Sequence, residues 1–456
     1  MNLKLPAKLI ESFIDITPVD EDKFEAAHQN PPVISVRLNP YKPISSFDDH
    51  AKVPWSDGGR YLNERPNFTA DPLLHAGCYY VQEASSMFLE YALKQLIDFN
   101  QQLLALDLCA APGGKSTLLS SLLNDRSLLI SNEVISTRAT ILTENLTKWG
   151  KLNTWVTSND PKHFSPLKNV FDLVLVDAPC SGSGLFRKMP AFANDWNMDT
   201  VHLCSQRQQR ILHDVIDSVK DNGILVYMTC SFCEDENEEI VDRILEEFEV
   251  DSCQLDVQEE WGIVETESKN RKGFGYRFFP HLLQGEGFFI ACFRKKELDR
   301  EGPKIDLTRK VKARTDATSL EAFVDLADKY VIVQNDLLIL IESAHTVYAD
   351  YFSKYLKLIK KGILCGKQIR TELIPEHELA LYADIRKDIN AIELSFTDAI
   401  RYLQKENFDI ACPSKGWYVV RYAGYNLGWI KNVGNRINNY YPSNYRILNR
   451  NILLNL

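Results

Sequence analysis

The sequence predicts an α/β protein with a doubly wound central sheet and a smaller mixed region at each end. Two observations support this fold class. Between residues 103 and 296, apolar runs typical of buried parallel strands alternate with segments of helical periodicity. Before and after this stretch the segments are shorter and mixed, which is typical of α+β units. We therefore expect four parts, at residues 1–95, 96–297, 298–317 and 318–456.

The first two parts contain most of the expected elements. In the N-terminal part, residues 32–38 are predicted to form a strand and residues 81–97 a helix. The strands of the sheet are expected at 103–108, 127–135, 154–158, 171–176 and 223–228, with a later antiparallel pair at 252–257 and 287–294. Between that pair, residues 268–277 are basic, Gly-rich and aromatic, which favours a mobile loop at a substrate surface. An ordinary solvated loop explains this composition equally well.

The C-terminal third begins with a charged segment that is poor in large apolar residues. We interpret residues 298–317 as a linker for this reason. Beyond it, residues 320–330 and 396–405 are predicted to be helical and residues 331–342 rich in strand. The last 46 residues are expected to form short strands separated by Gly and Asn turns.

The composition excludes several classes of protein. The chain has 456 residues, of which 45% are hydrophobic and 25% charged, so it can bury ample core. It has no run of eighteen apolar residues and no apolar leader near Met1, so we expect neither a membrane helix nor secretion. The ten cysteines lack the spacing of a disulfide framework, which is typical of reduced thiols in a cytoplasmic protein.

The net charge of −10 argues against a nucleic-acid partner only weakly, because the charge is unevenly distributed. Residues 298–456 carry 23 basic and 19 acidic side chains, and residues 411–456 carry six basic side chains and no acid. A local field of one sign steers a polyanion more than the total charge does.

A glycine-rich turn follows the first strand of the expected sheet. It consists of Cys109, Ala110, Ala111, Pro112, Gly113, Gly114 and Lys115. Glycines here let the backbone approach a ligand at a helix N-terminus. The turn is not a P-loop, since Cys109 stands where that motif needs glycine, and the pattern G-x-G-x-x-G is absent.

Two acidic residues extend this turn into a candidate cofactor site. Glu133, at the end of the second strand, is placed to bind ribose hydroxyls, and Asp160, at the end of the third, is placed near an adenine. Together with the turn they predict an adenosine cofactor without a polyphosphate, for which S-adenosylmethionine is the obvious candidate.

Two later strands each end at a cysteine, Cys180 after Asp177 and Cys230 after a threonine. Two thiols at one sheet edge favour covalent catalysis. Methylation of C5 of a pyrimidine requires such a thiolate, because addition at C6 makes C5 nucleophilic. Enzymes that methylate exocyclic amines typically carry Asp/Asn-Pro-Pro-aromatic instead. Buried, inert cysteines are the plain alternative, whereas Cys230 and Cys233 form a single C-x-x-C without histidines, which is poor support for a metal or redox site.

The segments 109–115, 177–184 and 229–231 together closely resemble the NOL/NOP/Sun family of RNA (cytosine-5) methyltransferases. The resemblance extends over residues 31–297 and implies a Rossmann-like, S-adenosylmethionine-dependent sheet. It also implies that Cys230 is the nucleophile and that Cys180 assists product release. Spacing alone does not rank the two thiols, and the opposite assignment is chemically sensible.

The resemblance further implies roles for the remaining site residues. Asp177 would contact the cytosine ring and the methionine end of the cofactor, and Lys115 would line the active site. Glu133 would hold the ribose, Arg138 would support that edge, and Asp160 would hold the adenine. It implies no metal.

The C-terminal tail resembles the end of bacterial 16S rRNA methyltransferases of the RsmF type, which implies a PUA-like α+β RNA-binding region. The composition of the tail is typical of RNA binding too, because six cations and eight aromatic side chains offer phosphate contacts and stacking faces. Some of these aromatics must be core. The expected contacts are Lys415, Lys431, Arg436 and Arg446. Residues 298–395 resemble nothing that we can name.

The sequence therefore predicts a monomeric, cytoplasmic, S-adenosylmethionine-dependent RNA cytosine-5 methyltransferase that acts on 16S rRNA or the small ribosomal subunit, without a DNA or membrane partner. A tRNA methyltransferase is the alternative within the same chemistry. A non-catalytic assembly factor on this fold is disfavoured because both thiols, Asp177 and the glycine turn are intact. The aromatic, acid-free tail disfavours a protein or small-molecule methyltransferase.

Overall fold

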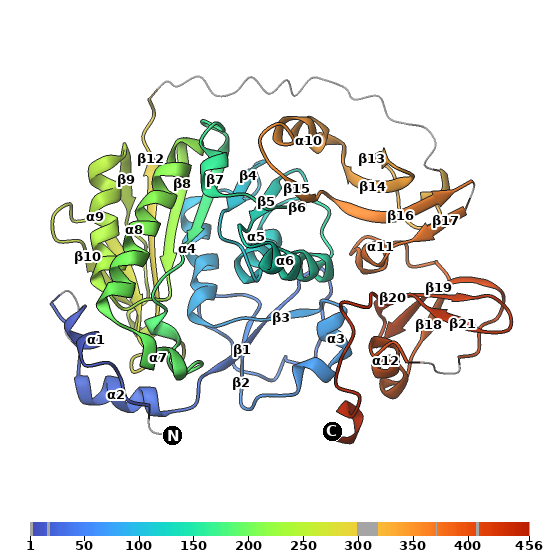
Figure 1. The fold of residues 1–456 in the computed structure, drawn as a ribbon, viewed down its shortest axis with the longest axis horizontal. Coiled ribbons are helices and arrows are strands. Elements are labelled where there is room, and N and C mark those ends of the chain that lie inside the picture. Colours follow the sequence, from blue (N-terminus) through green and yellow to red (C-terminus); the bar gives the residue numbers. More distant parts are fainter. Residues whose placement is uncertain (1–2, 16–18, 299–317, 371, 407–409, 456) are drawn as a thin grey trace.

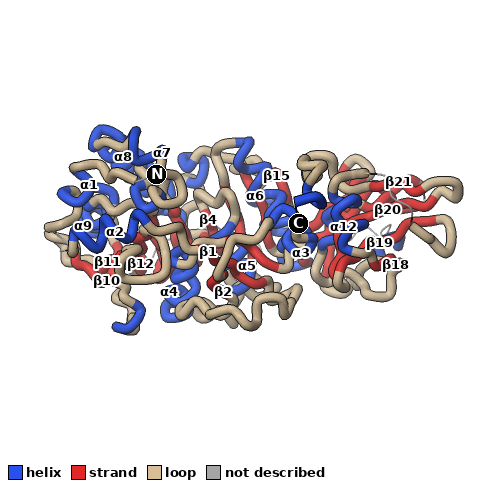
Figure 2. The backbone as a smooth tube through the Cα atoms, turned by 90° about the horizontal axis from the view of Figure 1, so that it is seen from below, coloured by secondary structure: helices blue, strands red, loops and turns tan. Residues whose placement is uncertain are grey.

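The computed structural model describes residues 3–15, 19–298, 318–370, 372–406 and 410–455, so almost all of the expected linker lies outside the described residues. The molecule is elongated, with a large sheet and its helices in one half and two smaller sheets in the other (Figure 1). Figure 2 shows the same two halves from below, with the long axis again horizontal. Within the described ranges, no helix is long and apolar enough to cross a membrane.

The central sheet has ten strands and contains all five parallel strands expected from the sequence. They are β4 (Leu104–Asp107), β5 (Leu128–Asn132), β6 (Thr154–Thr157), β7 (Phe171–Asp177) and β8 (Val219–Thr229). Their spatial order is β6-β5-β4-β7-β8, so the chain reverses direction across the sheet between β4 and β7. Ligands of doubly wound sheets bind at the carboxyl ends of the strands beside such a switch point.

Antiparallel strands extend the sheet on both sides. They are β9 (Val250–Cys253), β10 (Val264–Glu267), β11 (Phe274–Phe278) and β12 (Phe288–Lys295) beyond β8, and β15 (Leu358–Lys360) beyond β6. The expected antiparallel pair is confirmed, since β12 pairs with both β8 and β9. The strand β15 comes from the C-terminal third of the chain and hydrogen-bonds to β6, which ties that part to the sheet.

Helices cover both faces of the central sheet, which explains why its strands are apolar throughout. They are α4 (Phe88–Leu96), α5 (Gly114–Leu122), α6 (Ser136–Trp149), α8 (Met198–Val215) and α9 (Glu238–Glu247). Successive residues of β4 point to opposite faces. Leu106 packs in one cluster with Ile211 of α8, whereas Ala105 packs in the other with Leu118 of α5 and Phe88 of α4.

The N-terminal part contains a three-stranded sheet that is joined to helix α5 of the central sheet. Its strands are β1 (Ile34–Leu38), β2 (Gly59–Leu62) and β3 (Tyr79–Val81), and its helices are α1 (Lys8–Glu11), α2 (Glu21–Gln29) and α3 (Pro72–His75). Arg37, whose side chain is buried, links the two. Its guanidinium donates to the Gln82 side chain at 2.7 Å and to the Thr117 hydroxyl at 2.5 Å, and it lies 4.6 Å from the Trp149 ring.

The C-terminal part contains two four-stranded sheets. One is formed by β13 (Lys329–Gln334), β14 (Leu337–Glu342), β16 (Ile363–Ile369) and β17 (Glu372–Pro375). The other is formed by β18 (Ala391–Glu393), β19 (Gly416–Tyr422), β20 (Tyr425–Asn432) and β21 (Ile437–Asn439). The helices are α10 (Thr346–Phe352), α11 (His377–Leu381) and α12 (Phe396–Leu403). The expected strands at 331–342, the helix at 396–405 and the short strands of the tail are confirmed.

Three expectations about local structure are wrong. The helix expected at 81–97 starts only at Phe88, because the Glu83 carboxylate binds the N–H groups of Ser85 and Ser86 in a separate turn. The helix expected at 320–330 is instead a short turn at Thr318–Leu320 and a loop that leads into β13 at Lys329. Residues 274–277 of the loop expected at 268–277 belong to strand β11, and Arg277 is buried within it.

Candidate active site

The glycine turn connects β4 to α5 as expected. Gly113 has φ +117°, a left-handed conformation that side chains other than glycine rarely adopt, and α5 begins at the next residue. No side chain caps the N-terminus of α5. Its first N–H groups are therefore left for an anionic or polar ligand.

A cleft of 350 Å³ opens at this turn. Its walls come from the turn, the ends of β7 and β8, residues 80–86 of the N-terminal part and residues 286–288 before β12. The expected site residues that line it are Cys109, Ala110, Ala111, Pro112, Gly114, Lys115, Asp177 and Cys230. Gly113, Glu133, Arg138, Asp160 and Cys180 are not among its lining residues.

Lys115 and Asp177 form an ion pair on the wall of the cleft, with Nζ 2.8 Å from Oδ2. Burial disfavours the charged ammonium, but the Asp177 carboxylate outweighs it and raises the pKa of Lys115. Cys230 contributes to the same increase, so the ammonium and this sulfur lie close enough to interact. Lys115 therefore remains a cation beside a thiol that faces the cleft.

Asp107 is a site residue that the sequence interpretation missed. It ends β4, lines the cleft and is fully buried. Oδ2 accepts a hydrogen bond from the Ser116 hydroxyl at 2.7 Å, whereas Oδ1 has no partner among the described residues. Burial raises the pKa of this carboxyl to about 7. Its position at the end of the first strand was the available signal.

The two cysteines meet, with their sulfur atoms 3.0 Å apart. They occupy different surroundings, because Cys230 lines the cleft and Cys180 does not. The hydrogen bond with Cys230, and then burial, raise the pKa of Cys180 well above its ordinary value. Cys180 is thus held as a neutral thiol against the sulfur that faces the cleft. Cys233, the other half of the C-x-x-C, instead packs in an apolar cluster with Phe13 and Phe24.

A single buried carboxylate holds both cysteine segments together. Glu236 accepts hydrogen bonds from the Ser181 N–H at 2.8 Å and from its hydroxyl at 2.6 Å. It also accepts from the Ser231 hydroxyl at 2.5 Å and from the Gln208 amide at 3.2 Å. Because Ser181 and Ser231 each follow a cysteine, this carboxylate sets the separation of the two thiols. The sequence interpretation missed Glu236, although the matching serines were a signal.

A second buried pair supports the segment after Cys230. Arg277 of β11 forms an ion pair with Glu238 of α9, and both side chains are almost fully buried. Arg277 also donates to the carbonyl of Phe232 at 2.6 Å. This basic residue therefore acts inside the protein and not on a loop that meets the substrate.

The three residues expected at the adenosine end lie at the same sheet edge. Glu133 is buried, accepts from the Ile135 N–H at 2.9 Å and lies 3.3 Å from the Arg138 guanidinium. Arg138 also donates to the carbonyl of Ala111 at 2.7 Å, which joins this edge to the glycine turn. Asp160 accepts from the Lys162 N–H at 3.1 Å and begins a short turn.

Of the expected RNA contacts of the tail, Lys415, Arg436 and Arg446 are exposed. As expected, some aromatic side chains of the tail belong to the core, among them Trp429, Tyr418 and Tyr441. Lys431 is paired with Glu372 at 2.7 Å and lies 4.9 Å from the Trp417 ring. The tail is thus first a folded sheet, and fewer of its groups face solvent than their number in the sequence indicates.

Three family models match the chain in order. They are the N-terminal domain of 16S rRNA methyltransferase RsmF over residues 5–84, 16S rRNA methyltransferase RsmB/F over 94–294 and the methyltransferase RsmF PUA domain over 389–447. The chain is 28% identical to ribosomal RNA small subunit methyltransferase F of Vibrio atlanticus, covering 97% of both chains. It is 30% identical to the protein of the same name from Pectobacterium carotovorum, over 66% of each.

Solved structures share the fold of the catalytic half. A methyltransferase homolog from Pyrococcus horikoshii is 28% identical with a TM-score of 0.54, over 64% of this chain and 96% of that one. NSun6 from the same organism, solved with SFG, has a TM-score of 0.54 at 18% identity, over 65% and 100% of the two chains. With its glycine turn, cleft and paired thiols, the chain belongs to the RsmB/F family of S-adenosylmethionine-dependent methyltransferases.

Proposed function

We propose that this protein methylates C5 of cytosine in 16S rRNA, with Cys230 as the nucleophile and Cys180 as the residue that assists release. The observation that carries the proposal is the unequal placement of the two thiols. Cys230 lines the cleft beside Lys115, whereas Cys180 lies against it and is not among the lining residues. The names of the relatives, ribosomal RNA small subunit methyltransferase F, support the choice of RNA.

The residues of the cleft fit an adenosine cofactor. The 350 Å³ cleft leaves room for one, and the uncapped N-terminus of α5 leaves hydrogen-bonding capacity. So does Oδ1 of the buried Asp107, which has no partner within the part of the chain that the structure describes. Glu133 would hold the ribose, Asp160 the adenine, and Asp177 the methionine end. S-adenosylmethionine supplies the methyl group when it is bound.

Cys230 begins the reaction on the base. Its thiolate adds to C6 of the cytosine, and the electron pair of the C5–C6 bond makes C5 nucleophilic. The Lys115 ammonium lies close enough to this sulfur to interact with it, so a positive charge faces the nucleophile during the attack. Asp177, on the same wall, is placed to accept a hydrogen bond from the amino group at the ring edge of the cytosine.

Cys180 acts after C5 carries the methyl group. The proton on C5 passes to a water molecule, its electron pair reforms the C5–C6 double bond, and the bond from C6 to the Cys230 sulfur breaks to release that sulfur as a thiolate. The neutral Cys180 thiol lies 3.0 Å from that sulfur, so it can hydrogen-bond to the departing thiolate. The target base must leave its stack to enter the cleft.

The same proposal covers the roles of the other two parts of the chain, the oligomeric state and the location of the protein. Residues 1–95 and 318–456 bind RNA on either side of a methyltransferase part at 96–297, and the protein works as a monomer in the cytoplasm. The PUA model over residues 389–447 supports the RNA-binding role of the C-terminal part.

The test compares thiol variants on 16S rRNA transcribed in vitro. Cys230→Ala is expected to give neither methylation nor a covalent complex. Cys180→Ala is expected to accumulate a covalent RNA–protein adduct on a denaturing gel, because release stalls. Cys253→Ala changes a half-buried thiol on β9 and should behave as the wild type. If Cys180→Ala loses activity without forming an adduct, the assignment of roles is wrong. Bisulfite mapping of rRNA and tRNA from cells that lack the protein identifies the substrate, and loss of a tRNA mark alone would overturn the choice of rRNA.

A further inference from the structure

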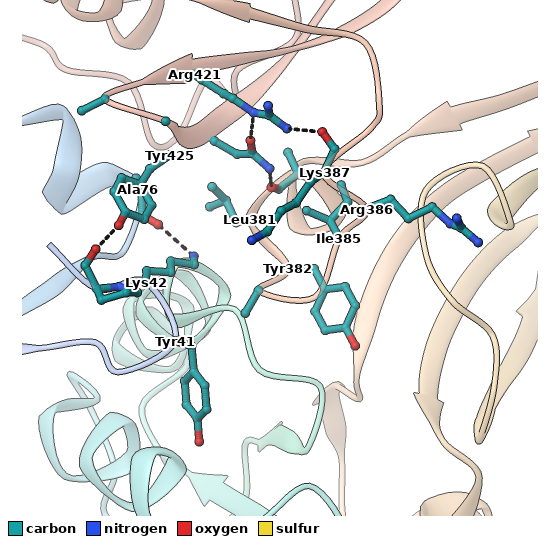
Figure 3. A pocket seen from close by; sticks show the side chains of 16 residues that line it. Tyr41, Lys42, Ala76, Leu381, Tyr382, Ile385, Arg386, Lys387, Arg421 and Tyr425 are labelled. Atoms are coloured by element: carbon teal, nitrogen blue, oxygen red, sulfur yellow. Dashed lines mark hydrogen bonds between the residues drawn. The ribbon is translucent and has the colours of Figure 1, made fainter.

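A second cleft, of 420 Å³, lies away from the thiols, between the N-terminal and C-terminal parts (Figure 3). Its walls come from three segments that are distant in the sequence. The first is residues 41–43, which follow β1. The second is residues 380–387, which include the end of α11 and the loop after it. The third is residues 421–426, which form the turn between β19 and β20. Its volume lies within the range of about 300–1,000 Å³ typical of ligand sites.

The lining of this cleft has a charge opposite to that of the whole chain. It includes Lys42, Arg386, Lys387 and Arg421, and no lining residue is Asp or Glu. The chain as a whole carries 62 acidic and 52 basic residues. A concave surface with cations alone concentrates an anionic ligand, because its low-dielectric walls focus the field.

Hydrogen bonds hold the three walls together. The Asn426 amide donates to the carbonyl of Ala380 at 2.9 Å, and the Tyr425 hydroxyl donates to the carbonyl of Pro43. Arg421 donates to the Asn426 side chain at 2.8 Å. A cleft fixed in this way spends little conformational entropy on binding.

Lys42 is a buried cation without a carboxylate partner among the described residues. Its side chain is 8% exposed, and Nζ donates to the carbonyls of Ala76 at 2.8 Å and Lys148 at 2.7 Å. Burial lowers the pKa of this ammonium to about 8. Carbonyl dipoles compensate a buried charge only in part, so an anion in the cleft would stabilise it further.

Lys387 provides a cation that is free to meet a ligand. Its side chain is exposed and makes no ion pair within the described ranges. Figure 3 shows it extending over the cleft toward Lys42.

A smaller hollow relates this cleft to the catalytic one. Its volume is 210 Å³, and it shares Tyr80 and Val81 with the catalytic cleft. It also includes Lys148, whose carbonyl accepts the hydrogen bond from Lys42. The hollow shares no lining residue with the cleft beside Lys42, but the contact between Lys42 and Lys148 brings the two close together, as an extended strand that reaches Cys230 requires.

We propose that the cleft lined by Lys42, Lys387 and Arg421 binds a backbone phosphate of the RNA substrate, at a nucleotide other than the one that is methylated. This inference rests on the proposed function. The phosphate site adds to the proposed function a contact formed by the segment at 380–387, which lies outside the three matched family regions. This cleft thus takes no part in the methylation of a base, and its role is to position the RNA strand.

The test uses the full chain with Lys387→Glu, and Lys354→Glu as a control with the same charge change at an exposed lysine outside the cleft. Binding to 16S rRNA transcribed in vitro is measured at several salt concentrations. Because the proposed ligand is an extended strand, loss of one phosphate contact should reduce the slope of log K against log salt by about 0.7. The KM for RNA should rise while kcat at saturating RNA is retained, and Lys354→Glu should match the wild type.

Two outcomes separate the proposals. If the wild type methylates this RNA and Lys387→Glu keeps the wild-type slope and KM, the phosphate site is wrong and the proposed function stands. If the wild type methylates no RNA, the proposed function fails with it. Lys387→Ala checks that the effect follows the lost cation and not the added acid, and it should give the same reduction in slope.

Discussion

Replacing Glu236 by glutamine should slow methylation strongly while the protein stays folded. The carboxylate accepts two hydrogen bonds at each oxygen, and it is fully buried. Glutamine keeps one acceptor oxygen for the Ser181 N–H and the Gln208 amide. Its NH₂ group cannot accept from the Ser181 and Ser231 hydroxyls, so the link between the two cysteine segments changes.

The structure sets the size of this effect. A hydrogen bond to a charged group contributes about 1.5–3 kcal/mol. Two such bonds are lost, but each hydroxyl can turn and accept from the new NH₂ group, so we expect a net loss of about 2 kcal/mol. If that loss falls on the placement of the thiols in the transition state, the rate falls about 30-fold.

The assay is single-turnover methylation of 16S rRNA, followed by a denaturing gel. Glu236→Gln should turn over about 30-fold more slowly and accumulate the covalent adduct, because Cys180 no longer lies against Cys230. The control is Glu239→Gln, an exposed glutamate one helical turn away, which should match the wild type. A rate within about twofold of wild type together with a lower melting temperature would show that Glu236 supports only the fold.

Two further predictions concern buried charges. Burial raises the pKa of Asp107 to about 7 from an ordinary value of 3.8. Between pH 3.8 and about 7 this carboxyl is ionised in the unfolded chain but protonated in the folded protein, so the free energy of unfolding falls as the pH rises. Across this range the wild type should lose on the order of 4 kcal/mol of that free energy relative to Asp107→Asn, measured by urea unfolding. A difference that stays constant with pH would contradict this prediction. Arg37→Ala should lower the free energy of unfolding by about 3 kcal/mol, because it leaves the Gln82 and Thr117 partners and the Trp149 ring uncovered. Arg37→Lys should recover only part of that loss in the same measurement, since an ammonium cannot reproduce the guanidinium fork, and full recovery would contradict the role of the fork.

Local pattern was enough to place the strands of the catalytic sheet. The parallel strands are short, apolar on both faces and separated by helices, so each is recognisable without its neighbours. The same pattern failed at residues 268–277, where antiparallel pairing with β10 places residues 274–277 in a strand. Strand pairing depends on partners elsewhere in the chain, and periodicity does not report them.

The sequence by itself determined which chemical groups this protein brings to the edge of its sheet. Parallel strands must end on the same side, so the glycine turn, Asp177, Cys180 and Cys230 were bound to meet there. Only the tertiary structure decided how these groups differ. The cleft lies on the Cys230 side of the thiol pair, Glu236 reaches both cysteine segments, and burial makes Asp107 a weak acid. The physical reason is that burial, pKa and separation depend on segments distant in the sequence, which only the packed chain brings together.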